Sequence, residues 1–540
     1  MILFVENNDS FSWNVLDLLP FPPEAVRVVR SGAGQDLRAL LTSDVERVVV
    51  GPGPMDPHRV GLVPFVQEVA RRRLPYLGIC LGHQALGLAF GAELVRSTPA
   101  HGQRAVARFA ESRTFASVRG DVEVMRYHSL SLRDVRAPLK VVASLGDGTV
   151  MAVEHESLPM AGLQFHPDSF GTPRGFELLG GAKPPATSKL VAPEPWAGRN
   201  PTPLRLSTLE GDFALLAPSF APSPRERGEG RGEGPWTFID LASATPNATL
   251  WHARAEGRPI ALRGEARPVT LNVDVPPDNL TAHLDESGFL EGVGTIRNAI
   301  AAGDVYQVNL TLRAALSNVS GGAGLLSALC RRGVPRFGAW VRAKAIGEFV
   351  SASPELLVET SGRNVRVEPM KGTAAPSQRA WLEASEKDRA ELAMITDLLR
   401  DDLHRLCVRG GVAVPNSRRF IELPYVLQTV ADVVGTLREG VSVAEVLAQV
   451  HPGGSVTGAP RVAACEQIAR LEPTPRGAYC GMLGLELGDA MTAALLIRTA
   501  ERTAGGWTYG VGSGITWDSV PEQELDEVRL KLGALQATDR

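Results

Sequence analysis

Short apolar runs separated by turn residues and helical stretches mark the first third of the chain. From residue 1 to about residue 180 these runs are MILFV, RVVVGPGP, LPYLGIC, LKVVASL and AGLQFH. Strand-like runs that alternate with helical stretches are typical of an open α/β sheet. We therefore predict an α/β domain over residues 1–180, with a mostly parallel sheet flanked by helices.

Two later segments lack any such pattern. Residues 181–203, GAKPPATSKLVAPEPWAGRNPTP, are rich in Pro, Ala and Gly, which indicates an extended linker between domains. Residues 221–235, APSPRERGEGRGEGP, repeat Arg-Gly-Glu-Gly and contain almost nothing to bury. We predict a disordered surface insertion over this second segment.

Strands and helices mix in the rest of the chain, which predicts a larger α+β domain over residues 204–540. Residues 519–535 should form a helix that begins with a capping box of Ser519 and Glu522. Residues 385–407 predict another helix, with Glu391 beside its apolar stripe. The stripe consists of Leu392, Ile395, Leu399, Leu403 and Leu406.

Composition narrows the functional classes. The chain has 540 residues and a net charge of -4, so it offers no basic surface for nucleic acid or for an anionic membrane, and small-molecule partners are favoured. Its first residues resemble neither a signal peptide nor a membrane anchor. Its five cysteines form no CxxC pair, which argues against disulfides or a zinc site. We expect a cytoplasmic protein.

A cysteine occupies a tight turn between a predicted strand and a predicted helix. In YLGICLGHQAL, Cys80 lies between two glycines that let the backbone turn, and the helix N-terminus favours its thiolate. A lone cysteine is more often simply buried. However, GLQFHPDS places His166 and Asp168 at the end of another strand, where the imidazole could deprotonate the thiol and the carboxylate could orient the ring.

The motifs DSF, GPGP, GICLGHQ, HG, YHSL and QFHPDS follow one another over residues 1–180 and resemble the class I glutamine amidotransferases. The resemblance implies that Cys80 is the nucleophile, His166 the base and Asp168 the orienting acid. Asp168 stands where this family usually has Glu, so its bond to the histidine should be longer. The resemblance further implies an oxyanion hole and a glutamine site formed by Gly53, Leu81, Gln84, Ser129 and Leu130.

Three carboxylates on the two predicted helices could bind one divalent ion. Glu524 and Glu527 are three residues apart on one helix, and Glu391 lies on the other. Oxygen ligands of this kind suit Mg²⁺, although a glutamate pair with this spacing is more often an ordinary solvated helix face.

The same carboxylates belong to a set of motifs over residues 285–540 that resembles the chorismate-utilising enzymes. GDVYQVNL, SASPELL, EPMKGT, HPGGSVTGAP and GSGITWDSVPEQELDE occur in the family's order, whereas residues 204–284 match weakly. The resemblance implies a two-sheet β-sandwich core with outer helices, Mg²⁺ as cofactor, and chorismate as substrate. It implies a chorismate site formed by Thr457, Tyr479, Arg498, Gly512, Ser513, Gly514 and Lys531.

Lys371 indicates which of the chorismate-utilising enzymes the chain resembles. PMKGT resembles the aminodeoxychorismate synthases, whereas anthranilate synthases typically have a small residue at this position. A lysine amine withdrawn from water into an apolar pocket could attack C2 of chorismate and expel the C4 hydroxyl. Ammonia could then add at C4 and expel the lysine, and Glu355 would act as acid and base. A separate aminodeoxychorismate lyase would act on the product. An anthranilate synthase-like or other aminochorismate synthase is the alternative, and a regulator without catalysis is a third.

Overall fold

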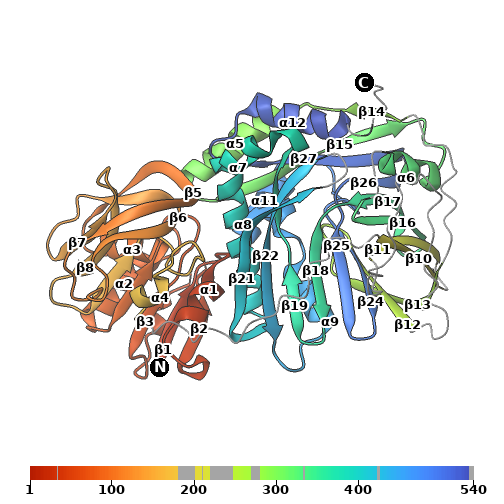
Figure 1. The fold of residues 1–540 in the computed structure, drawn as a ribbon. Coiled ribbons are helices and arrows are strands. Elements are labelled where there is room, and N and C mark those ends of the chain that lie inside the picture. Colours follow the sequence, from red (N-terminus) through yellow and green to blue (C-terminus); the bar gives the residue numbers. More distant parts are fainter. Residues whose placement is uncertain are drawn as a thin grey trace.

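The structure is a computed structural model that describes residues 1–32, 35–180, 201–208, 211–218, 247–268, 280–331, 335–422, 426–533 and 535. The predicted insertion at 221–235 and most of the predicted linker at 181–203 lie outside the described residues, and a strand begins at Pro201. Two parts lie side by side, a smaller N-terminal part and a larger C-terminal part (Figure 1).

The N-terminal part is built on a nine-stranded mixed sheet, with the order β2-β1-β3-β4-β9-β8-β7-β5-β6. The parallel half consists of β1 (Ile2–Glu6), β2 (Val26–Arg30), β3 (Arg47–Val50), β4 (Tyr76–Ile79) and β9 (Met160–Leu163). The antiparallel half consists of β5 (Glu93–Phe109), β6 (Gly120–Arg133), β7 (Leu139–Ser144) and β8 (Val150–His155). The helices are α1 (Ser12–Leu18), α2 (Leu62–Arg71), α3 (Leu81–Ala89) and α4 (Gly175–Leu178), with short 3₁₀ turns at Pro23–Ala25 and Leu37–Leu40.

The strands of the C-terminal part form one hydrogen-bonded network of 18 strands, and all their recorded pairings are antiparallel. They are β10 (Pro201–Thr208), β11 (Gly211–Pro218), β12 (Asn247–Ala253), β13 (Ile260–Pro268), β14 (Thr281–Leu284), β15 (Gln307–Ser317), β16 (Phe337–Ala343), β17 (Gly347–Ser353), β18 (Leu356–Ser361), β19 (Asn364–Val367), β20 (Met370–Ala374), β21 (Cys407–Glu422), β22 (Leu427–Leu437), β23 (Gly458–Ala459), β24 (Met482–Leu487), β25 (Ala490–Leu495), β26 (Thr499–Thr503) and β27 (Gly506–Ile515).

Helices cover this network. They are α5 (Phe289–Ala302), α6 (Gly322–Cys330), α7 (Arg379–Ala384), α8 (Glu386–His404), α9 (Val443–Val450), α10 (Gly454–Thr457), α11 (Arg461–Leu471) and α12 (Pro521–Gly533), with a 3₁₀ turn at Pro376–Gln378. The predicted fold classes, α/β followed by a larger α+β part, are confirmed. Within the described ranges, no helix is both long and apolar enough to cross a membrane.

Helix α8 lies between the two parts (Figure 1). Ser385 caps it by accepting a hydrogen bond from the Asp388 amide at 3.2 Å, as expected of a serine just before a helix. The predicted apolar stripe is buried along its whole length and packs with β21 and β22. Helix α12 begins at Pro521, but the Ser519 hydroxyl accepts from the Thr516 amide, and no Ser519–Glu522 capping box is recorded in this described segment.

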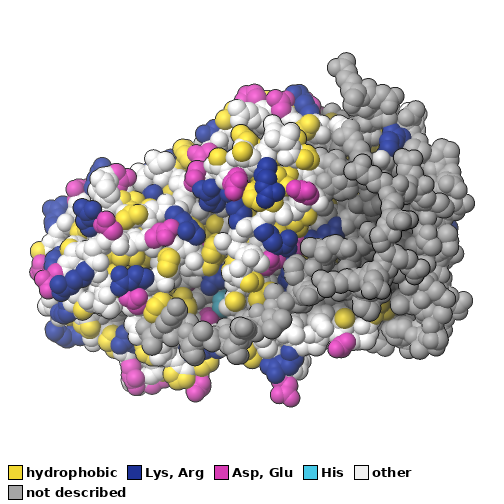
Figure 2. Space-filling view, viewed as in Figure 1, with side chains coloured by type: hydrophobic (Ala, Val, Ile, Leu, Met, Phe, Trp, Pro, Cys, Tyr) yellow, Lys and Arg dark blue, Asp and Glu magenta, His cyan; other side chains and the backbone are white. Residues whose placement is uncertain are grey.

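Charged side chains are mixed over the visible face of the N-terminal part. Figure 2 shows Lys and Arg interspersed with Asp and Glu there, without a large patch of one sign. On this face, the distribution agrees with the net charge near zero in the sequence.

Candidate active sites

Cys80 occupies a strained turn between β4 and α3. Its backbone has φ 52° and ψ -100°, a conformation that costs a non-glycine residue free energy. Glycines on both sides make the turn possible: a Cβ on Gly78 would lie 2.3 Å from the Gly82 carbonyl carbon, and one on Gly82 would lie 2.4 Å from the Val50 oxygen. The side chain is therefore fixed at the N-terminus of α3.

The predicted triad residues come together in the buried space above this turn. His166 Nδ1 lies 3.3 Å from Asp168 Oδ1, which is long for a charged hydrogen bond and agrees with the short side chain of Asp168. Burial lowers the pKa of His166, but the Asp168 carboxylate and the Cys80 thiol raise it more, so that it lies well above the ordinary value. The raised pKa favours the imidazolium form of His166 beside Cys80.

The residues predicted to form the oxyanion hole and the glutamine site make the following contacts. Gly53 lies against Leu81, since a Cβ on this glycine would be 2.9 Å from the leucine Cδ2. Gln84 Nε2 donates to the Leu130 carbonyl at 3.2 Å. The Ser129 hydroxyl donates instead to a carbonyl of the C-terminal part, that of Ile300, at 2.5 Å. The hydroxyl of Ser129 therefore faces the domain interface.

An aromatic cluster from both parts surrounds the triad. Tyr306, which lies just before β15, donates to Asp9 Oδ2 at 2.7 Å and stacks on His101 with ring centroids 4.8 Å apart. Burial raises the pKa of Asp9 to about 7, although His166 and the Tyr306 hydroxyl lower it. Phe11 stacks on the other side of Tyr306, with centroids 6.0 Å apart. The wall of this site thus includes a side chain of the C-terminal part.

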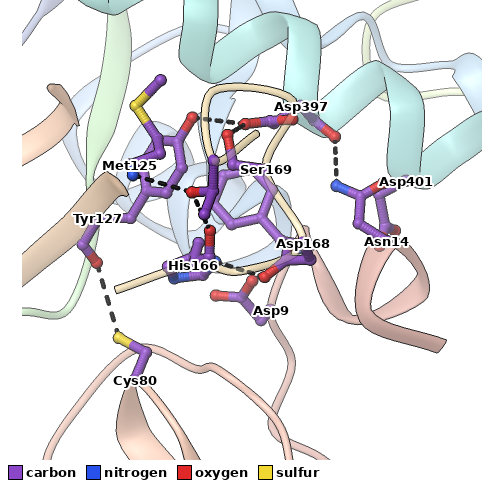
Figure 3. Close-up of polar contacts among 12 residues, drawn as sticks. Asp9, Asn14, Cys80, Met125, Tyr127, His166, Asp168, Ser169, Asp397 and Asp401 are labelled. Atoms are coloured by element: carbon purple, nitrogen blue, oxygen red, sulfur yellow. Dashed lines mark hydrogen bonds and ion pairs between the residues drawn. The ribbon is translucent and has the colours of Figure 1, made fainter. Parts of the chain in front are cut away.

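Helix α8 provides a second set of contacts to the triad (Figure 3). Asp397 accepts from the Tyr127 hydroxyl at 2.8 Å, from the Ser169 hydroxyl and from the Phe170 amide at 3.3 Å. Arg400 donates to the Asp168 carbonyl at 3.0 Å and to Asp397 at 2.6 Å. Neither the apolar stripe of α8 nor Glu391 predicts these contacts, because their partners lie more than 200 residues away in the chain.

A second polar site lies in the C-terminal part around Lys371 on β20. Lys371 Nζ is 3.6 Å from Glu391 Oε2 and 3.4 Å from the Ser455 carbonyl oxygen, and the side chain is 11% exposed. The prediction of an apolar pocket around this lysine is therefore wrong, because Glu391 projects into it. Glu355 accepts from the Ser455 hydroxyl at 2.5 Å, and burial raises the pKa of this carboxyl to about 7 against the opposing effects of Ser455 and Lys371.

Gly514 brings the backbone of β27 against this site. A Cβ at this position would lie 2.5 Å from Gln307 Nε2, 3.1 Å from Lys371 Nζ and 3.4 Å from Glu391 Oε2. Only glycine permits this approach. Gly512 is equally close to β15, since its Cβ would lie 2.5 Å from the Leu310 oxygen.

The three predicted metal ligands lie around a lysine. Lys387 Nζ donates to Glu524 Oε1 at 2.7 Å and lies 3.9 Å from Glu391 Oε1. The Ser513 hydroxyl contacts both Glu524 and, at 3.5 Å, Glu527. In the part of the chain that the structure describes, no three His, Cys, Asp or Glu side chains are grouped closely enough to hold a metal in this arrangement.

The other predicted chorismate residues are spread over the C-terminal part. Thr457 donates to the Gly453 carbonyl at 2.9 Å within α10, and Lys531 donates to the Gly512 carbonyl at 2.8 Å and pairs with Glu527. Tyr479 is buried beneath the Arg313 guanidinium, 4.8 Å from its ring centroid. Arg498 lies in the break between β25 and β26, with φ 51°.

Comparison with known families follows the same division of the chain. Residues 3–181 match glutamine amidotransferase class I, and residues 235–537, more than half of the chain, match the chorismate binding enzymes. The chain belongs to the chorismate binding enzyme family. It carries a class I glutamine amidotransferase domain in front of the chorismate-binding domain.

Individual relatives extend this assignment. The chain is 29% identical to the aminodeoxychorismate synthase of Streptomyces pristinaespiralis, over 98% of this chain and 95% of the relative, and 28% identical to that of Streptomyces griseus, over 99% and 94%. It is 32% identical to anthranilate synthase component 1 3 of Haloarcula marismortui, over 55% of this chain and 62% of the relative.

A cavity of about 700 Å³ lies between the amidotransferase and chorismate-binding domains. His101, Met125 and Phe170 line it on the amidotransferase side, and Tyr306 on the other. Glu391, which contacts Lys371, lines it as well. Residues that neighbour both sites therefore line one cavity.

Proposed function

We propose that this chain is an aminodeoxychorismate synthase, which hydrolyses glutamine in its first domain and uses the ammonia to aminate chorismate at C4 in its second. Full-length similarity to two aminodeoxychorismate synthases supports this activity. The observation that carries the choice of chemistry is Lys371, whose amine lies beside Glu391 in the second site.

The first half-reaction uses the paired Cys80 and His166. The thiolate attacks the side-chain carbonyl of glutamine, and the imidazolium gives its proton to the leaving ammonia, which leaves a thioester on Cys80. Water, deprotonated by His166, then hydrolyses the thioester to glutamate. The amides of Gly53 and Leu81 would stabilise the oxyanion in both steps.

The second half-reaction replaces a hydroxyl by an amine. The free amine of Lys371 attacks C2 of chorismate while the hydroxyl at C4 leaves as water with a proton from Glu355. Ammonia then adds at C4 and the bond between Lys371 and C2 breaks. The enolpyruvyl group is kept, so a separate lyase would be needed to form 4-aminobenzoate.

The carboxylates near Lys371 suit Mg²⁺ in their chemistry. Lys387 already places one positive charge between Glu391 and Glu524, so the donor set accepts a cation. Mg²⁺ would be held by these two residues and Glu527 after Lys387 moves aside, and when bound it would offset the negative charge of the substrate carboxylates.

Product identification tests the proposal. Purified protein with chorismate, glutamine and MgCl₂ should form an amino-for-hydroxyl product by mass spectrometry, and 4-aminobenzoate only after a lyase is added. An anthranilate synthase activity is the alternative, favoured by the similarity to anthranilate synthase components over half the chain. Direct appearance of fluorescent anthranilate would contradict the proposal in favour of that alternative.

A further inference from the structure

We propose that Asp397 and Arg400 on α8, which belong to the chorismate-binding domain, are positioning residues of the glutaminase triad. One control, the amination of chorismate with added ammonium salt, rests on the proposed function. The main measurement, the release of glutamate from glutamine, does not depend on what the second domain makes.

Asp397 is a buried carboxylate surrounded by hydrogen-bond donors. Its side chain is 1% exposed, and its carboxylate accepts from Tyr127, Ser169, Phe170 and Arg400. Three of these donors belong to the amidotransferase domain. A buried carboxylate that meets only donors is strongly fixed, because each unpaired donor would cost free energy.

Tyr127 connects Asp397 to the two reacting residues. Its ring packs edge-on against His166, with centroids 5.0 Å apart and an interplanar angle of 86°. Its carbonyl oxygen is the hydrogen-bond partner of Cys80 Sγ, at 3.8 Å. A change in the position of Tyr127 therefore changes the surroundings of both the nucleophile and the base.

Arg400 acts on the third member of the triad. It donates to the backbone carbonyl of Asp168, while the next residue, Ser169, donates to Asp397. Two neighbouring residues of this loop, Asp168 and Ser169, are thus hydrogen-bonded to α8. With a contact of 3.3 Å between His166 and Asp168, a small movement of this loop has a direct effect on the orientation of the imidazole.

Asp397→Asn tests this role, because an amide nitrogen would face the donors that the carboxylate now accepts. Asp402→Asn is the matched control: Asp402 is a buried carboxylate on the same helix, but its recorded hydrogen-bond partners, Gln449 and Arg461, lie in its own domain. Tyr127→Phe is a milder variant that removes one hydroxyl and keeps the ring.

We expect Asp397→Asn to lower kcat for glutamate release by about 10- to 100-fold relative to Asp402→Asn, with a smaller effect on KM. Tyr127→Phe should lower kcat in the same direction by a smaller factor. The rate of Cys80 alkylation by iodoacetamide should follow a pH profile displaced to higher pH in Asp397→Asn, because the imidazolium would no longer be held beside the thiolate.

Amination of chorismate with added ammonium salt separates positioning from folding. Glu391 lies on the same helix, so damage to α8 would lower both glutamate release and ammonia-dependent amination, and that joint loss would overturn the inference. Equal glutamate release by Asp397→Asn and Asp402→Asn would also overturn it. If wild-type protein releases glutamate but forms no product from ammonia, the proposed function fails, and helix integrity is then judged from thermal unfolding.

Discussion

The two active sites are built from the chain in opposite ways. The glutaminase site depends on short contiguous motifs: a strained turn holds Cys80, and His166 and Asp168 follow one strand. The chorismate-binding site gathers single charged residues from distant segments, with Lys371 on β20, Glu391 on α8 and Glu524 on α12. Local backbone geometry fixes the first site, whereas the second depends on how the sheet and helices pack.

The sites also differ in how their charges are balanced. The predicted glutaminase triad is buried, and the pKa of His166 is raised because Asp168 and Cys80 outweigh the effect of burial. Around Lys371, by contrast, two lysines lie close to two carboxylates: Lys371 is near Glu391, and Lys387 is near both Glu391 and Glu524.

Removing the nucleophile of the first site should have the largest effect and should separate the two sites. Cys80→Ala should lower glutamine-dependent amination by about 10⁴-fold or more, the scale observed when a covalent nucleophile is lost. Amination with added ammonia should stay near the wild-type rate, because the second site is untouched. Parallel assays with glutamine and ammonium chloride measure this, and a comparable loss with both nitrogen sources would contradict the independence of the sites.

Loss of Lys371 should give the reverse result. Lys371→Ala should slow C4 amination from either nitrogen source by about 10³-fold, equivalent to about 4 kcal/mol of transition-state stabilisation. Glutamate release should persist. Chromatography with mass detection would also reveal any product aminated at C2, and wild-type turnover at C4 in this variant would remove Lys371 from the mechanism.

The pH dependence of amination should reveal Glu355. With its pKa raised to about 7 by burial, this carboxyl is protonated below that pH and loses its proton above it, so an acid role predicts that amination falls as the pH rises through about 7. Glu355→Gln should be about 100-fold slower and should lack this descending limb. Glutamate release, measured over the same pH range, should be alike in both proteins. A limb that persists in the variant would assign it to another group.

The smallest effect is expected from the backbone of the second site. In Gly514→Ala, the added methyl must displace Gln307 and crowd Lys371. A packing cost of about 1 kcal/mol in the bound state predicts that chorismate binding weakens about fivefold. Isothermal titration measures the affinity. Gly533→Ala, at the end of α12 with nothing within 4 Å of its Cβ, is the matched control and should bind as the wild type does.

The difference between the sites also decides what sequence could predict. Cys80, His166 and the buried stripe of α8 could be predicted, because each is marked by a motif or pattern of neighbouring residues in the sequence. Contacts such as Tyr127 with Asp397, which are 270 positions apart, leave no local signal. The same holds for Lys387, whose position between two glutamates depends on the packing of α8 against α12.

Arg498 and Ser129 show the same limit in single side chains. Arg498 follows the apolar run of β25, and its backbone has a positive φ there. Ser129, which is predicted to hold glutamine, directs its hydroxyl to the Ile300 carbonyl of α5 across the interface. In both cases the identity of the residue was informative, and its direction depended on tertiary structure.

Helix α8 has a consequence for recombining these domains. Glu391 and Asp397 are about 9 Å apart along one helix. Helix α8 therefore carries both a residue near Lys371 and the hydrogen-bond acceptor of Tyr127. The proposed role of Asp397 and Arg400 therefore implies that the amidotransferase domain cannot be exchanged without the helix that supports it. A chimera that joins it to another synthase would need a matching carboxylate and guanidinium on the new partner's helix, and a library of such chimeras would be sorted first by these two positions.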